Sequence, residues 1–237
     1  MSNLNRVYEA TDVGCVRPIN EDRAAVFEPS VYVVADGMGG HAAGEVASHI
    51  LVEVVRKELA GCAAIGEQEL SSAIHRANHA ILQTVAERPD CKGMGTTATI
   101  LHLDGDQALW AHVGDSRLYL LRGGVLHQVT RDHSYVEDLV AQGELTEEEA
   151  RIHPQKNVLT RAVGVEADII VDTGRFTVQP GDILLLATDG LMNMVQEPEI
   201  CAILGRQEGD VARALIEAAL ASGGRDNVTA VVVVYAP

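Results

Sequence analysis

The feature of this sequence that most constrains its fold is that strand-like and helix-like patterns come in runs and do not alternate. An apolar strand is expected at 31–35, followed by two amphipathic helices at 42–60 and 67–88. The remaining patterns predict strands at 96–103, 107–113, 117–121, 125–129, 169–171, 175–178 and 183–187, helices at 197–204 and 210–221, and a last strand at 228–235. Such runs favour an α+β fold of four layers, an α/β/β/α sandwich of two antiparallel sheets flanked by helix pairs.

The domain organisation follows from length and local polarity. A chain of 237 residues is long for one domain, but sandwiches of this size fold as a unit, so we expect residues 1–237 to form a single domain. Residues 131–161 lack the apolar density of a core and hold only short amphipathic pieces at 135–141 and 146–152. We expect a mobile flap at about 131–164.

Charge and hydropathy exclude several classes of partner. The formal net charge of −16 disfavours nucleic acid, because phosphate binding relies on clustered Lys and Arg. No apolar run reaches the roughly 18 residues that cross a bilayer. The four cysteines, Cys15, Cys62, Cys91 and Cys201, are scattered, so we expect reduced, buried thiols in a cytoplasmic, monomeric protein without membrane contact.

Aspartates stand where apolar strands end. Asp36, Asp115 and Asp189 each lie beside a glycine at a strand end, and Asp226 precedes the last strand. Taken singly, each is most simply a turn residue. If the strands share one sandwich, however, their ends can converge, and crowded carboxylates repel one another unless a cation neutralises them.

The donor types predict which cation this is. Oxygen ligands select hard ions, Mg²⁺ or Mn²⁺, and two such ions at about 3.5 to 4 Å can activate a bridging water for attack on phosphorus. His75 and His79 are four residues apart on an expected helix, a spacing also found in zinc sites, but two solvated histidines are the simpler interpretation. The pattern indicates metal-assisted hydrolysis.

Short motifs in a fixed order carry a resemblance to a known family. The chain resembles the metal-dependent type 2C serine/threonine protein phosphatases (PPM) in their compact bacterial form, over nearly its whole length. The motifs are G-x-x-R-P-x-N-E-D at 14–22, D-G-M-G-G-H at 36–41, G-T-T-A at 95–98, G-D-S-R at 114–117, T-R-D-H-S at 130–134, A-T-D-G at 187–190 and R-D-N-V-T at 225–229.

The resemblance implies a binuclear Mn²⁺ or Mg²⁺ centre. Its ligands are expected to be Asp36, the backbone carbonyl of Gly37, Asp189 and Asp226, with Asp115 holding a third, weaker metal. Substrate hydrolysis is expected at phosphoserine and phosphothreonine of proteins, by a metal-bridging hydroxide and without a phosphoenzyme.

Other matched residues are expected to act around these ligands. Arg17 resembles the arginine that grips the substrate phosphate, and His41 the histidine proposed to protonate the leaving alkoxide. Asp22 and Glu21 are expected to act largely through water, and Asn227 either to support the centre or to shape the turn before the last strand. Arg117 and Arg161 are expected to pair with neighbouring carboxylates. The expected partners are phosphorylated proteins, including a Ser/Thr kinase or its substrates.

The sequence also contains partial matches to the motifs of other function classes. The spacing Gly37-x-Gly39-x-x-Ala42 imitates a dinucleotide fingerprint, but a second helix follows where the second strand belongs. Gly39 to Gly44 imitates a P-loop without its Lys. No cysteine is followed, after five residues, by the arginine of a cysteine phosphatase. A catalytically silent relative that binds phosphoproteins remains the alternative.

Overall fold

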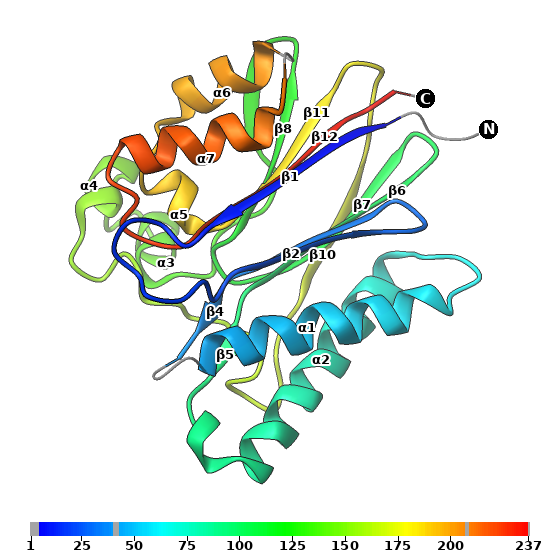
Figure 1. The fold of residues 1–237 in the computed structure, drawn as a ribbon, viewed down its shortest axis with the longest axis vertical. Coiled ribbons are helices and arrows are strands. Elements are labelled where there is room, and N and C mark those ends of the chain that lie inside the picture. Colours follow the sequence, from blue (N-terminus) through cyan, green and yellow to red (C-terminus); the bar gives the residue numbers. More distant parts are fainter. Residues whose placement is uncertain (1–4, 40–42, 207–208, 237) are drawn as a thin grey trace.

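Two five-stranded antiparallel sheets face each other in the computed structural model, which describes residues 5–39, 43–206 and 209–236 (Figure 1). The first sheet has the order β1-β12-β11-β8-β9 and the second the order β10-β7-β6-β3-β2. The strands are β1 (Arg6–Asp12), β2 (Arg23–Phe27), β3 (Val31–Ala35), β6 (Ala98–Asp104), β7 (Gln107–Val113), β8 (Arg117–Arg122), β9 (Val125–Gln128), β10 (Asp172–Thr177), β11 (Ile183–Ala187) and β12 (Val228–Val234), with a separate pair β4 (Gly37–Met38) and β5 (Gly95–Thr96).

Helices cover the outer face of each sheet, which confirms the expected α/β/β/α sandwich (Figure 1). The pair α1 and α2 packs on the second sheet, and α6 and α7 pack on the first. The helices are α1 (Ala43–Ala60), α2 (Glu67–Glu87), the 3-10 turn η1 (Pro89–Cys91), α3 (Tyr135–Ala141), α4 (Glu147–Ile152), α5 (Asp189–Met192), α6 (Glu197–Arg206) and α7 (Val211–Ala221). The start of the helix expected at 42–60 lies partly outside the described residues.

The central strands are apolar at every position because both of their faces are buried. In β12, Val231 and Val233 point into the layer between the sheets, whereas Ala230 and Val232 point into the helix layer of α6 and α7. Successive side chains of a strand alternate between faces, so a strand between two apolar layers needs no polar residue. Asp36, Asp115 and Asp189 follow the ends of β3, β7 and β11, and Asp226 precedes β12.

Several strands differ from the sequence prediction. Strands β1, β2 and β4 were not predicted, the strand expected at 169–171 was wrong because these residues form no strand, and the strand expected at 175–178 belongs to β10, which begins earlier, at Asp172. Gly174 lies inside β10 opposite Trp110, where a Cβ would come within 2.7 Å of the indole ring. Gly174 is therefore a position where the strand accommodates an aromatic ring.

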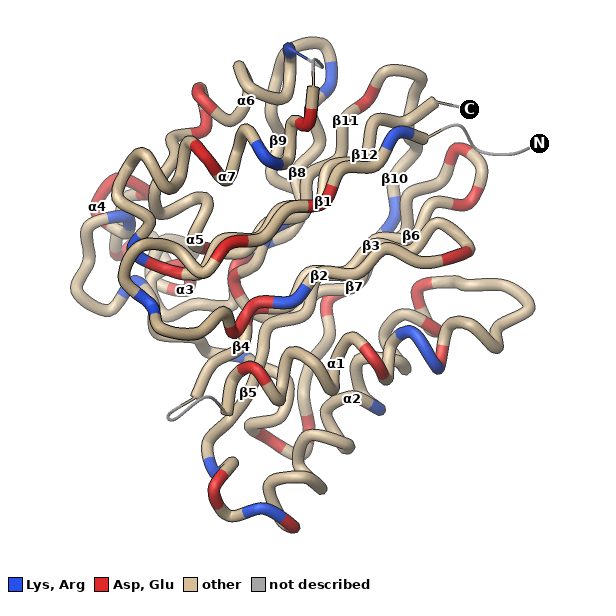
Figure 2. The backbone as a smooth tube through the Cα atoms, viewed as in Figure 1, with Lys and Arg blue, Asp and Glu red and all other residues tan. Residues whose placement is uncertain are grey.

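The predictions for the cysteines, the surface charge and membrane-spanning segments can be compared with the structure. All four cysteines are free thiols, but only Cys91 is buried and Cys15 is exposed, so the expectation of four buried thiols was wrong. Lysines and arginines are scattered among the acidic residues over both sheets and helix layers (Figure 2). Within the described part of the chain, no helix is long and apolar enough to cross a membrane.

Candidate metal centre and active site

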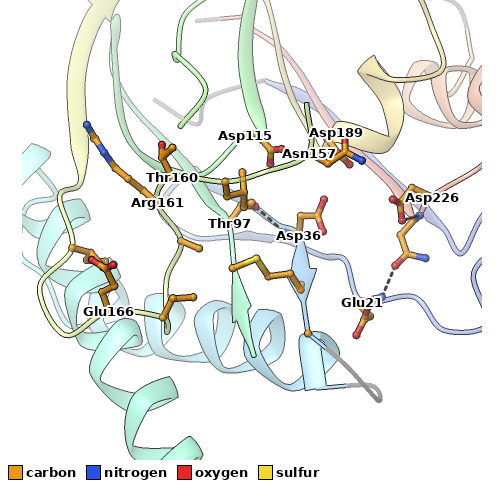
Figure 3. A pocket seen from close by; sticks show the side chains of 18 of the residues that line it. Glu21, Asp36, Thr97, Asp115, Asn157, Thr160, Arg161, Glu166, Asp189 and Asp226 are labelled. Atoms are coloured by element: carbon orange, nitrogen blue, oxygen red, sulfur yellow. Dashed lines mark hydrogen bonds between the residues drawn. The ribbon is translucent and has the colours of Figure 1, made fainter. Parts of the chain in front are cut away.

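Four aspartates from separate strands line one cavity of about 610 Å³ at the end of the sandwich (Figure 3). Asp36 follows β3 and Asp115 follows β7, both in the second sheet. Asp189 follows β11 and Asp226 precedes β12, both in the first sheet. The two sheets therefore contribute two carboxylates each, and the convergence expected from the strand ends is present.

Close backbone packing fixes the segment that carries Asp36. A Cβ on Gly37 would overlap the backbone oxygens of Gly44 and Glu21, so only glycine fits between these chains. The Gly37 N–H donates to the Glu21 carbonyl at 3.2 Å, and Ser48 Oγ donates to the same carbonyl at 2.6 Å. Gly37 itself lines the cavity.

The clustered carboxylates resist ionisation in the absence of a cation. Burial raises the pKa of Asp36 well above its ordinary value, and the negative charges of Asp22, Asp189, Asp115 and Asp226 raise it further. Burial likewise raises the pKa of Asp115 and of Asp189, with added repulsion from neighbouring carboxylates. A bound cation would stabilise the ionised form of these carboxylates by offsetting their mutual repulsion.

Asp22 is not among the residues that line the cavity and is only 1% exposed. Its Oδ2 accepts a hydrogen bond from Thr188 Oγ1 at 2.8 Å, while its Oδ1 is buried without a described protein partner. Burial, together with the charges of Asp189 and Asp226, raises the pKa of Asp22 to about 7 despite the hydrogen bonds it accepts. An unpartnered buried carboxylate oxygen is a position where a water or an ion belongs.

The donor set fits hydrated hard cations. Among the described residues, no three acidic, histidine or cysteine side chains are arranged to hold an ion by themselves. Mg²⁺ and similar ions keep several waters and use only one or two carboxylates. The described residues therefore do not form a site in which all ligands are side chains, but they are compatible with a cation whose coordination is completed by water. Pairs of aspartates with the Gly37 carbonyl supply hard oxygen donors.

The residues expected around the ligands lie at the rim of the cavity. Arg17 Nη2 donates to Asp226 Oδ2 at 2.9 Å, with the Arg17 side chain 50% exposed. Asn227 Oδ1 accepts from the Glu21 N–H at 2.8 Å, and its amide group donates to the carbonyls of Val13 and Ile19 at 2.9 Å each. Asn227 thus ties the loop that carries Arg17 and Glu21 to the start of β12.

Sequence analysis missed the groups that position the aspartates. Thr97 Oγ1 accepts from the Asp36 N–H at 2.9 Å and shares a 2.6 Å hydrogen bond with Ser116 Oγ. Asn193 Nδ2 donates to Asp189 Oδ2 at 2.9 Å, and Lys156 Nζ donates to Asn193 Oδ1 at 3.0 Å. Thr97 belongs to the G-T-T-A motif, so that motif was the available signal.

The histidines and the remaining arginines named in the sequence analysis lie in different parts of the chain. His41 lies outside the described residues. His75 and His79 are exposed on α2, away from the residues that line the cavity. Arg117 pairs with Asp132 at 2.8 Å and Arg161 with Asp172 at 2.9 Å, as expected of residues that pair with neighbouring carboxylates.

Comparison with known proteins identifies the family. A sequence model described as Protein phosphatase 2C matches residues 19–221. The serine/threonine phosphatase stp of Listeria monocytogenes is 42% identical over 234 residues, which cover 94% of this chain and 93% of that protein. The crystal structure of the serine/threonine phosphatase PstP/Ppp of Mycobacterium tuberculosis superposes with a TM-score of 0.90 at 38% identity, covering 98% of this chain and 99% of that one. A structure of the PstP catalytic domain in complex with two manganese ions superposes with a TM-score of 0.88 at 36% identity, covering 98% and 99%. This chain therefore belongs to the protein phosphatase 2C family.

Proposed function

We propose that this chain is a metal-dependent serine/threonine protein phosphatase whose cation centre is held by Asp36, the Gly37 carbonyl, Asp189 and Asp226. The observation that carries the proposal is the convergence of these groups from both sheets on one cavity with an arginine at its rim. The relatives named above are serine/threonine phosphatases, and one was solved with two manganese ions. Asp115, on the same cavity, is proposed to hold a third, weaker cation.

When bound, cations held by these residues would supply Lewis-acid charge and an activated water for attack on phosphorus. The chain's own contribution is to hold the carboxylates rigidly, so that no rearrangement is needed when the substrate binds. Thr97 and Asn193 restrain Asp36 and Asp189 by the hydrogen bonds described above. Asp22 Oδ1 is proposed to accept a hydrogen bond from a water in the centre, since it has no described protein partner.

Arg17 is proposed to bind the substrate phosphate. Its present pair with Asp226 is half-exposed, and exposed ion pairs contribute only about 0 to 1 kcal/mol, so the guanidinium can exchange its partner readily. A guanidinium presents two parallel N–H donors that match a phosphate oxygen pair. His41 is proposed to protonate the leaving alkoxide, Glu21 to act through water, and Asn227 to hold the loop of Arg17 in place.

The substrates are phosphorylated proteins, and we propose that they include a Ser/Thr kinase or its substrates, because a kinase must place the phosphate that this enzyme removes. A single domain of residues 1–237 with a mobile flap at 131–164 is also proposed, the flap lying beside the cavity through Asn157 and Thr160. Four free thiols support a reducing compartment, the cytoplasm. A monomer is proposed, and light scattering tests it.

The function is tested by hydrolysis of p-nitrophenyl phosphate and of a phosphothreonine peptide, with Mn²⁺, with Mg²⁺ and with EDTA. Metal-dependent turnover of both substrates, abolished by EDTA, is expected. Turnover that persists in EDTA would contradict the metal centre. Absence of turnover with any metal, combined with retained phosphopeptide binding, would instead support a catalytically silent relative.

The single-displacement mechanism has its own test. Because the attacking group is a water, no side chain becomes phosphorylated during turnover. Rapid quenching followed by intact-protein mass spectrometry is expected to detect only unmodified chain. A covalently phosphorylated species that forms and decays at the turnover rate would overturn this mechanism.

A further inference from the structure

The cavity of the metal centre extends beyond the aspartates to a second wall. This outer wall consists of Val165, Glu166, Asp168, Ile169 and Ile170, in a segment without helix or strand between the flap and β10. Figure 3 shows Glu166 and Asp226 on opposite sides of the cavity, with Asp36 between them. None of the groups assigned to metal or phosphate binding belongs to the outer wall.

Hydrogen bonds with Asn78 on α2 hold the backbone of the outer wall in place. Asn78, which is 2% exposed on α2, accepts a hydrogen bond from the Gly164 N–H at 2.6 Å. Its amide group donates to the carbonyls of Glu166 at 2.8 Å and Ala167 at 3.2 Å. Three hydrogen bonds to one buried side chain fix a segment that has no regular secondary structure. The side chains that line the cavity therefore project from an anchored backbone.

The outer wall exposes branched aliphatic side chains. Val165 is 52% exposed and Ile170 is 67% exposed, while Ile169 is half-buried against the helix layer. Both exposed residues line the same cavity as the aspartates, together with Met38. Apolar surface gathered at a cavity that already has a chemical function is typical of a ligand contact.

The outer wall also carries negative charge without a partner. Within residues 5–39, 43–206 and 209–236, neither Glu166 nor Asp168 forms an ion pair. The two arginines of the cavity are already paired, Arg17 with Asp226 and Arg161 with Asp172. A basic group entering the cavity would therefore meet two exposed carboxylates that form no ion pair with any described residue.

We propose that the outer wall is a subsite for the substrate residues that flank the phosphorylated residue, and that it selects an aliphatic side chain next to a lysine or arginine. The aliphatic side chain packs on Val165 and Ile170, and the basic one pairs with Glu166 and Asp168. This inference rests on the proposed function, because it takes the occupant to be a phosphopeptide whose phosphate lies at the aspartates. It assigns peptide preference to a segment that the metal centre does not use.

The test compares kcat/KM for phosphothreonine peptides that carry Leu-Arg, Ala-Ala or Leu-Asp, placed at successive positions on either side of the phosphothreonine. Each value is divided by kcat/KM for p-nitrophenyl phosphate, which reports the metal centre alone. The wild-type protein is expected to prefer the Leu-Arg peptide at one position by roughly three- to fivefold over each alternative, about the effect of partly burying one aliphatic group or adding one exposed charge pair.

Variants assign this preference to named side chains. In the double variant Glu166→Gln/Asp168→Asn, the discrimination between the Leu-Arg and Leu-Asp peptides is expected to disappear. In Ile170→Ser, the advantage of peptides with Leu over the Ala-Ala peptide is expected to disappear. Glu166→Lys, which reverses one charge, is expected to favour the Leu-Asp peptide. The matched control is Glu147→Gln/Glu148→Gln, an equal change of charge on α4 in a second cavity of about 660 Å³, and it is expected to keep the wild-type preference.

Two results would overturn the proposal. One is equal use of all peptides by the wild-type protein while p-nitrophenyl phosphate is hydrolysed normally. The other is an equal loss of preference in the control variant, which would make the effect one of overall charge. Failure of the proposed function is distinguishable, because hydrolysis of p-nitrophenyl phosphate would then be absent as well.

Discussion

The two walls of the cavity are built in different ways. The wall of aspartates is assembled at the ends of buried strands, where Gly37 allows no side chain and Thr97 holds the Asp36 backbone. The outer wall is an exposed segment anchored chiefly by Asn78. A cation centre tolerates little displacement, so its ligands lie on rigid elements, whereas peptide contacts can vary without loss of the chemistry.

The largest expected effect comes from removing a ligand on the aspartate wall. Asp36→Asn is expected to lower kcat/KM by roughly 10³-fold, since it removes an anionic cation ligand. It also removes one of the repelling charges, so thermal stability in EDTA is expected to rise slightly. Kinetics and a thermal melt check both results, with Asp104→Asn at the exposed β6–β7 turn as the control. Near-normal activity would mean that the aspartate wall is not the centre.

The pH dependence of stability is expected to arise from Asp22, whose pKa is raised by burial and by the charges of Asp189 and Asp226 on the aspartate wall. Asp22 has a folded-state pKa of about 7 against an ordinary pKa of 3.8, so folding takes up a proton between these values. The contribution of Asp22 to stability in EDTA is therefore greatest at low pH and declines as the pH rises through that window, by about 4 kcal/mol in all. Urea unfolding at pH 5 and pH 7.5 measures the decline, and Mn²⁺ is expected to reverse it. A metal-free protein that is more stable at pH 7.5 would contradict the clustering of charge.

Arg17 tests whether phosphate binding belongs to the rim of the aspartate wall. Arg17→Ala is expected to lower kcat/KM by roughly 10²-fold with both peptide and p-nitrophenyl phosphate, because both substrates carry the phosphate. Arg213→Ala on α7 is the matched control. A loss confined to the peptide would move Arg17 to substrate-chain recognition.

A variant of Asn78, which anchors the outer wall, tests most directly whether the two walls act independently. Asn78→Ala removes three hydrogen bonds and leaves the Gly164 N–H buried, so it is expected to destabilise the fold by about 2 kcal/mol. Its Mn²⁺ affinity is expected to stay that of the wild type, while peptide preference weakens. Loss of Mn²⁺ binding at a temperature where the variant is folded would show that the walls are not independent.

The smallest expected effect is that of the complementary change on the aspartate wall. Thr97→Val keeps the shape of the side chain but loses its hydrogen bonds to the Asp36 N–H and to Ser116, at about 1 kcal/mol of stability. Mn²⁺ affinity is expected to fall severalfold without any change in the ratio of peptide to p-nitrophenyl phosphate hydrolysis. A changed ratio with unchanged Mn²⁺ affinity would reverse the assignment of the walls.

The aspartate wall was predictable because its signals are local. An apolar strand that ends on Asp-Gly is visible in sequence, and the ordered motifs tie Asp36, Asp189 and Asp226 together. The layers followed from runs of strands and helices in the same way. The roles that the motifs imply for individual residues, such as proton transfer by His41, remain predictions.

The missed features depend on contacts distant in sequence. Strand β1 has mostly exposed or half-buried positions and gains its strand form by pairing with β12 at the other end of the chain. Strand β10 contains Gly174, which leaves room for the ring of Trp110 on the paired strand β7. The anchoring role of Asn78 links residues 86 to 89 positions apart, and no local pattern reports such a contact.

The most direct test of the central claim is titration calorimetry of Mn²⁺ into protein stripped with EDTA. The wild-type chain is expected to bind two ions tightly, and Asp36→Asn and Asp189→Asn each to lose tight binding while remaining folded by circular dichroism. Wild-type binding in either variant, or no tight binding by the wild-type chain, would contradict a cation centre built from the strand-end aspartates.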